Sequence, residues 1–145
     1  TPRVTPQRGI SLSQKRVPMI VEALDPARTF PVGYENIVLR HVANIKLETD
    51  EMVTFLEGNS EYDVCRKDWG YYATPSLDKS LPGFGLRPAL MRYTITRHCF
   101  LVLVHMESIE EWRLYMAREG QELILWLDDP TVLEGLSHCK DQADE

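Results

Sequence analysis

Hydrophobic and polar residues alternate most regularly in the second half of the chain. Residues 89–95 follow the period of two that is typical of a half-buried strand. Residues 98–105 form an almost uninterrupted apolar run, which indicates a strand in the middle of a sheet. Residues 123–127 carry leucine at every second position and predict a further strand. The second half of the chain is therefore expected to contribute three strands.

The stretch between the second and third of these strands predicts a helix. Ser108 is followed three residues later by Glu111, a capping-box pattern in which each side chain bonds the backbone N–H of the other residue. Trp112 and Met116 lie on one face at helical spacing, and Gly120 is a typical helix stop. We expect this helix to lie on one face of the sheet.

The first half of the chain is less regular. Residues 19–24 form a short apolar stretch that predicts a strand. Residues 34–44 carry apolar side chains at helical spacing and predict a helix. Thr49 precedes two acidic residues and predicts the start of a second, shorter helix that ends at Gly58.

The order of the predicted elements points to a fold class. Strand, one or two helices, two strands, helix and strand follow one another, as in the ferredoxin-like βαββαβ plan. We predict an α+β fold with a mainly antiparallel sheet and helices on one face. One domain is expected to span residues 17–130, between a flexible basic linker at residues 1–16 and an acidic tail at residues 131–145.

Residues 58–88 show no convincing helical or strand pattern and predict a long loop inserted into this fold. An irregular segment of this length in a compact domain is usually either functional or disordered. The segment holds five of the thirteen aromatic residues, and disordered segments are poor in aromatics. We therefore expect an ordered loop. Its aromatics either cover the open face of the sheet or wall a binding surface.

Composition and charge narrow the classes of function. Hydrophobic residues make up 43% of the 145 residues and charged residues 26%, which excludes a wholly disordered or fibrous chain. The net charge of −6 argues against a broad surface for duplex nucleic acid, because phosphates require concentrated positive charge. The longest apolar run is far shorter than the ~18 residues of a membrane span, so no membrane contact is expected.

The cysteines and histidines do not indicate a metal or a cofactor. Three cysteines are an odd number, and none forms a C-x-x-C pair, so neither a disulfide framework nor a structural zinc site is predicted. His98 and Cys99 are neighbours on a predicted strand and would face opposite sides of it. We expect no cofactor and no metal, and a reducing, cytoplasmic location.

The sequence favours a small binding, accessory or regulatory module that acts through residues 62–87. The reason is the aromatic segment together with the lack of any recognisable set of catalytic residues. We expect a protein partner or self-association as a homodimer, with a small-molecule ligand as the other option. The predicted binding residues are Asp68, Trp69, Tyr71, Tyr72, Arg87 and Arg40.

Two other functions remain open at this stage. An enzyme would hold a small molecule between residues 62–87 and the sheet, with Cys65 or His41 as the reactive residue. A single-stranded nucleic-acid binder would stack bases on the tyrosines of the segment, beside nearby arginines. The acidic net charge makes the nucleic-acid option the weakest of the three.

Overall fold

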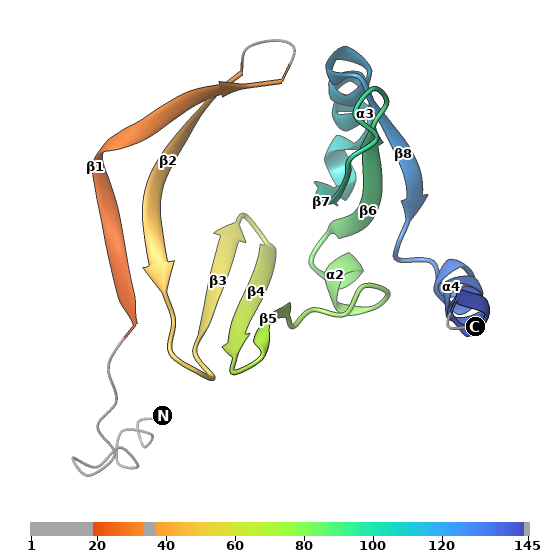
Figure 1. Cartoon of the computed structure of the whole chain (residues 1–145), viewed down its shortest axis with the longest axis horizontal. Coiled ribbons are helices and arrows are strands. Elements are labelled where there is room, and N and C mark those ends of the chain that lie inside the picture. Colours follow the sequence, from red (N-terminus) through yellow and green to blue (C-terminus); the bar gives the residue numbers. More distant parts are fainter. Residues whose placement is uncertain (1–18, 34–36, 144–145) are drawn as a thin grey trace.

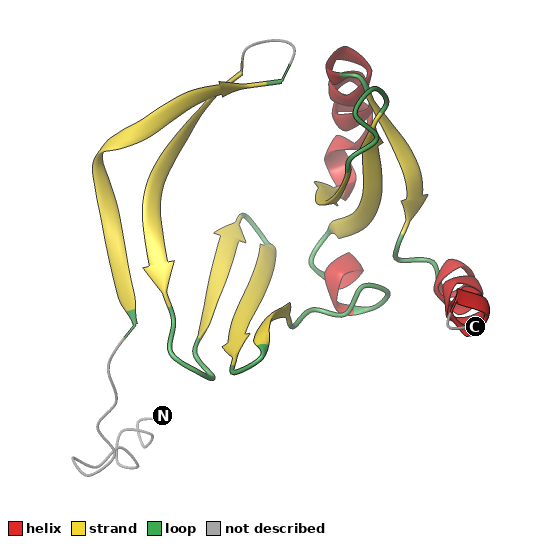
Figure 2. Ribbon diagram, in the orientation of Figure 1, coloured by secondary structure: helices red, strands yellow, loops and turns green. Residues whose placement is uncertain are grey.

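The computed structural model describes residues 19–33 and 37–143, and within them the strands form three separate antiparallel sheets. The sheets follow one another along the chain, and the helices accompany the last of them (Figures 1 and 2). The mainly antiparallel α+β class predicted from the sequence is confirmed. The predicted linker at residues 1–16 lies outside the described residues.

The first sheet is a two-stranded ribbon of β1 (Ile20–Val32) and β2 (Ile37–Lys46), which we call the arm. The strands stay paired over their whole length, apart from an irregularity between Ala23 and Arg28. In Figure 1 the arm arches away from the second sheet and reaches back, at its tip, toward helix α3.

The second sheet has the order β3-β4-β5 and consists of short, tightly connected strands. β3 (Met52–Glu57) turns through Gly58 and Asn59 into β4 (Ser60–Lys67). β4 then turns into β5 (Gly70–Ala73). Most residues of β3 are exposed and most of β4 are half-buried, so neither face of this sheet is fully covered in the described structure.

The third sheet holds the hydrophobic core. β6 (Leu86–Tyr93) lies between β7 (Cys99–His105) and β8 (Gln121–Trp126). Helix α3 (Ile109–Glu119) packs on it, with the Trp112 and Trp126 ring centroids 5.3 Å apart. The buried apolar side chains of the described residues all belong to this part of the chain: Leu81, Leu86, Ala89, Met91, Val104 and Met116.

Three short or terminal helical elements complete the described structure. α2 (Ser80–Gly83) leads into β6, the 3-10 turn η2 (Met106–Ser108) joins β7 to α3, and α4 (Pro130–Ala143) follows β8. None of the helices in the described ranges is long and apolar enough to cross a membrane.

Two helices predicted for the first half are strands. The helix expected at residues 34–44 is replaced by β2, and the one expected between Thr49 and Gly58 is replaced by β3. The apolar residues of β2 fit helical spacing and strand alternation equally well, and many of them are β-branched, which favours a strand. Pairing with β1, which local patterns do not reveal, decides between the two.

The ferredoxin-like plan and the long loop are not confirmed. That plan needs one four-stranded sheet, whereas the described strands form sheets of two, three and three strands. Residues 58–88 are not a loop, because they contain β4, β5, α2 and the start of β6. A sheet that is partly exposed on both faces needs no alternation of apolar and polar residues, so its strands escape pattern recognition.

The second half follows the prediction closely, with three local corrections. Residues 98–105, expected to form a strand in the middle of a sheet, give β7, which lies at the edge of its sheet, and β6 is the central strand. The three strands and the helix lie within a few residues of the expected positions. Ser108, however, makes no capping hydrogen bond, because η2 places it within a continuing helical turn. Residues 131–143, expected to belong to an acidic tail, form most of the fourteen-residue helix α4.

Candidate functional site

The six predicted binding residues lie on three different sheets. Arg40 belongs to the arm, Arg87 to the third sheet, and residues 68–72 to the turn and strand at the end of the second sheet. No single pocket of the described structure contains all of them. The predicted site therefore divides into separate surfaces.

The aromatic residues at the end of the second sheet are exposed. Trp69 is 70% exposed and stacks on Tyr72, with ring centroids 5.9 Å apart and planes inclined by 18°. Tyr71 is also exposed and, as the neighbour of Tyr72 in β5, faces the other side of the sheet. Asp68 accepts a hydrogen bond from the Thr49 hydroxyl at 2.6 Å, which ties the turn to the loop before β3.

Arg87 is held by an ion pair. Its Nε and Nη2 donate hydrogen bonds to the two carboxylate oxygens of Asp128 at 2.7 and 3.0 Å. The guanidinium carbon also lies 3.9 Å from the centre of the Trp126 ring. The hydrogen bond from Arg87 lowers the pKa of Asp128 below its ordinary value. These contacts give Arg87 a role in joining β6 to the segment after β8.

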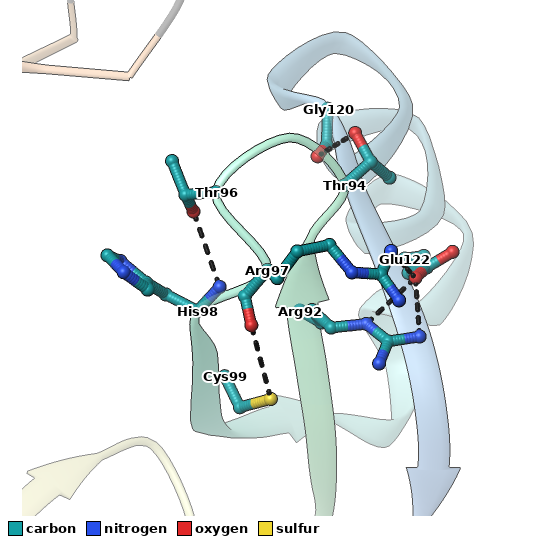
Figure 3. A network of polar contacts seen from close by, with 8 residues as sticks. All are labelled: Arg92, Thr94, Thr96, Arg97, His98, Cys99, Gly120 and Glu122. Carbon is teal, nitrogen blue, oxygen red and sulfur yellow. Dashed lines mark hydrogen bonds and ion pairs between the residues drawn. The ribbon is translucent and has the colours of Figure 1, made fainter.

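Two further arginines share one carboxylate at the end of the third sheet (Figure 3). Arg92 and Arg97 both reach the same oxygen of Glu122, at 2.8 and 3.5 Å. Arg97 has a positive φ of 67° in the turn between β6 and β7. The network fastens this turn to β8, so Arg92 and Arg97, like Arg87, are engaged with carboxylates.

The arm has one mainly apolar face and one mixed face, which we call the apolar face and the polar face. Residues that pair across the two strands lie on the same face, and alternate residues along a strand share it. The polar face carries Glu22, Thr29, Arg40 and Asn44, together with three exposed apolar side chains, those of Ile20, Val38 and Val42. The apolar face carries four large side chains that are 38–56% exposed, namely Val21, Phe30, Leu39 and Ile45.

One polar pair interrupts the apolar face near its middle. Arg28 lies opposite His41 and donates hydrogen bonds to its Nδ1 from Nε and Nη2, at 3.1 and 2.9 Å. The Nε2 of His41 lies 3.0 Å from the carbonyl oxygen of Ala43, which fits an N–H at Nε2 and a lone pair at Nδ1. Arg28 also lies over the ring of Phe30. The apolar face thus presents a single cation among hydrophobic side chains.

The tip of the arm contacts the end of α3. A side-chain carbon on Gly33 would lie 2.0 Å from Oε1 of Glu119, whose residue is only 1% exposed. Gly33 has a positive φ of 74°, which favours glycine. The absence of a side chain therefore lets the arm approach α3 at this point.

An open groove runs between the β7 edge and α3. It has a volume of about 790 Å³ and a mostly apolar lining, to which Phe100, Leu101, Trp112 and Leu114 contribute. Glu111 and Arg118 are charged residues on its α3 side. Within the described part of the chain, β7 pairs with a strand on one side only, and consecutive residues of this edge strand, 100–105, line the groove.

A second cavity of about 440 Å³ lies where the second and third sheets meet. On its wall, Oγ of Ser60 is 3.4 Å from Nδ1 of His105, and Nε2 of His105 is 3.1 Å from Oε1 of Glu57. Ser60 also donates a hydrogen bond to the carbonyl oxygen of Phe84 at 2.9 Å. The tight turn between β3 and β4 brings Glu57 and Ser60 together, and His105 comes from the end of β7.

Sequence reasoning missed both the arm face and the serine–histidine–glutamate cluster. The arm face had a signal, because the odd-numbered residues from Ile37 to Ile45 are mostly apolar and the even-numbered ones are mixed. The cluster has no local signal in the sequence, because Ser60 and His105 are 45 residues apart. Comparisons of the chain with protein-family models, curated proteins and solved structures gave no match.

Proposed function

We propose that this chain is a protein-binding module that binds its partner through the apolar face of the arm. The observation that carries the proposal is the number of large hydrophobic side chains that one ribbon exposes. Four of them, about half exposed, line the apolar face, whereas the other face mixes charged and polar side chains with the exposed Ile20, Val38 and Val42. Exposed apolar surfaces of this kind mark sites of protein association.

The arm needs such a contact for its own stability. A two-stranded hairpin alone is marginally stable in water, and the arm pairs with no third strand among the described residues. Full burial of one large apolar side chain is worth about 1.5–3 kcal/mol, so covering the four half-exposed ones would stabilise the arm by roughly 4 kcal/mol. A protein partner that covers this face supplies that burial.

The aromatic surface of the second sheet supports the same function. Tryptophan and tyrosine are enriched at the centres of protein interfaces, and Trp69 and Tyr72 present a stacked pair that is largely exposed. Both residues belong to residues 62–87, the segment for which the sequence predicted binding. We assign it a second contact with the partner.

A face-specific cross-linking experiment tests the proposal. A photo-reactive phenylalanine analogue replaces Leu39 on the apolar face in one variant and Arg40, its neighbour on the polar face, in the other. Irradiation of cells that produce each variant should attach a protein to the Leu39 position and much less to the Arg40 position. Equal attachment from both faces, or none from Leu39, would contradict the proposal.

A second candidate function is favoured by the cluster of Ser60, His105 and Glu57. Glu57 can accept the Nε2–H of His105, which leaves a lone pair on Nδ1. The Ser60 hydroxyl, which donates to the Phe84 carbonyl oxygen in the structure, would turn to Nδ1 and give its proton there. Ser60 would then attack the carbonyl carbon of a small ester in the adjoining cavity, and the proton on Nδ1 would pass to the departing alcohol. Water would release the acid by the reverse proton transfers and restore the serine.

Hydrolysis of an aryl acetate by the purified chain tests this candidate. Ser60→Ala and His105→Gln should each lower the rate at least about tenfold if the three residues act together, because general-base catalysis contributes ~10²–10⁴-fold. Ser108→Ala is the matched control, since Ser108 lines the same cavity and its hydroxyl has no histidine partner among the described residues. A Ser60→Ala variant with unchanged rate would exclude the enzyme.

A further inference from the structure

We propose that the partner is a second copy of this chain. The arm of each copy lies, apolar face down, in the groove between β7 and α3 of the other copy. The inference rests on the proposed protein-binding function and names its partner. A reciprocal contact of this kind has two-fold symmetry, which is the commonest symmetry of protein oligomers.

The groove and the arm face match in chemical character. Phe100, Leu101 and Leu114 of the groove are 47–62% exposed, and the four large apolar side chains of the arm face are 38–56% exposed. β7 also has an unpaired edge in the described structure, and this strand has no proline or lysine that would discourage a neighbour. An arm laid in the groove would cover these side chains and the free edge together.

One pair of charges on the two surfaces is complementary. The apolar face of the arm presents one cation, Arg28, and the groove presents the carboxylate of Glu111 as well as the guanidinium of Arg118 on its α3 side. The part of the chain that contributes β7 and α3 is acidic, because residues 99–139 contain two basic and eight acidic residues. The strands of the arm contain three basic and two acidic residues. In the proposed dimer, Arg28 of one copy forms an ion pair with Glu111 of the other.

The contact would be large enough for a stable dimer. Seven large apolar side chains of the arm face and groove, each roughly half exposed, offer on the order of 600 Å² per copy. Interfaces contain a comparable area of polar and backbone atoms around such a centre. The total therefore reaches the ~800 Å² per partner of a standard stable interface.

A charge-exchange experiment on the full chain tests the inference. Light scattering and sedimentation should show the native chain as a dimer. Arg28→Glu alone and Glu111→Arg alone each place like charges together at both contacts, and we expect each to raise the dimer dissociation constant at least about tenfold. An equimolar mixture of the two variants places opposite charges at both contacts and should restore the dimer.

Two matched controls accompany the variants. Arg40→Glu changes the same charge on the polar face of the arm, and Glu110→Arg changes the same charge next to Glu111 but outside the groove. Both should dimerise like the native chain. Thermal unfolding of every variant establishes that the chain is folded before its mass is compared.

The outcomes separate this inference from the proposed function. A native chain that stays monomeric while Leu39 cross-links to a different protein would overturn the inference and leave the protein-binding function in place. A native monomer with no cross-link from Leu39 would overturn both. A dimer that neither single charge change weakens, or that the mixture fails to restore, would overturn the assignment of the arm to the groove.

Discussion

At the scale of single residues, the structure separates side chains that hold the fold from side chains that remain available. Arg87 was expected to bind a ligand or partner, yet its donors point at Asp128 and its plane lies against Trp126. Trp69 and Tyr71 have no comparable burial. Position along the sequence does not distinguish these cases, because all three residues belong to the same aromatic and charged segment.

The ion pair of Arg87 makes a prediction about stability. Arg87→Met keeps the length of the side chain but leaves the mostly buried carboxylate of Asp128 without its partner. We expect a loss of about 1–3 kcal/mol in the free energy of unfolding at pH 7, measured by denaturant titration. Arg113→Met is the control and should cost less than about 0.5 kcal/mol, because the pair of Arg113 with Glu110 is exposed.

The same pair makes a prediction about pH. The pKa of Asp128 is lowered in the folded chain, so its ion pair contributes stability above the ordinary value of 3.8 and loses it as the pH falls through the lower, folded value. The difference in stability between the native chain and Arg87→Met should therefore be constant near neutral pH and shrink below about pH 4. A difference that grows on acidification would contradict this assignment.

At the scale of elements, the arm is the part whose structure depends most on its surroundings. Its two strands contact each other far more than any other element, and its tip meets α3 through Gly33 and Glu119. The third sheet, by contrast, has a helix packed on it and a buried strand at its centre. Elements with few buried apolar contacts open first in folded proteins, so the arm is expected to open before β6.

Gly33 allows a direct measurement of the contact at the tip. Gly33→Ala introduces both a strained positive φ and a methyl group at the place of the Glu119 carboxylate. Gly58→Ala, at the turn between β3 and β4, introduces a comparable strain with open space around it. Gly58→Ala should cost about 1–2 kcal/mol in the free energy of unfolding, and Gly33→Ala more. Equal losses would mean that the tip contact contributes nothing.

At the scale of the whole molecule, burial is concentrated at one end. The buried apolar side chains of the described residues lie in α2, β6, β7 and α3, whereas the arm and β3 expose theirs. A two-stranded ribbon with an apolar face is stable in water only if another surface covers that face. The folded unit that is stable in solution is therefore proposed to be larger than one chain.

Association of this kind makes thermal stability depend on concentration. If two copies cover each other's arms, the melting temperature of the native chain should rise as the protein concentration is raised, because binding stabilises the folded state by mass action. Leu39→Ser, on the apolar face, should abolish that dependence. Val38→Ser, on the polar face and at least as exposed, should preserve it. Calorimetry at several concentrations provides the measurement.

The sequence by itself determined the elements that are buried on one side. β6, α3 and β8 carry apolar residues at every second position of a strand or along one face of a helix, and β7 is a continuous apolar run; both patterns are typical of elements that pack against a core. Such periods are local, so they can be recognised without knowing what each element touches. The α+β class and the positions of these four elements follow from them.

Only the tertiary structure decided the arm, the second sheet and the candidate sites. β2 became a strand because β1 pairs with it, and β4 and β5 carry no period because their sheet is partly exposed on both faces. The cluster of Ser60, His105 and Glu57 forms where two sheets meet. Contacts between residues far apart in the chain leave no periodic pattern in the sequence. The residue type at each such position depends on a partner in a distant segment, which the local sequence does not reveal.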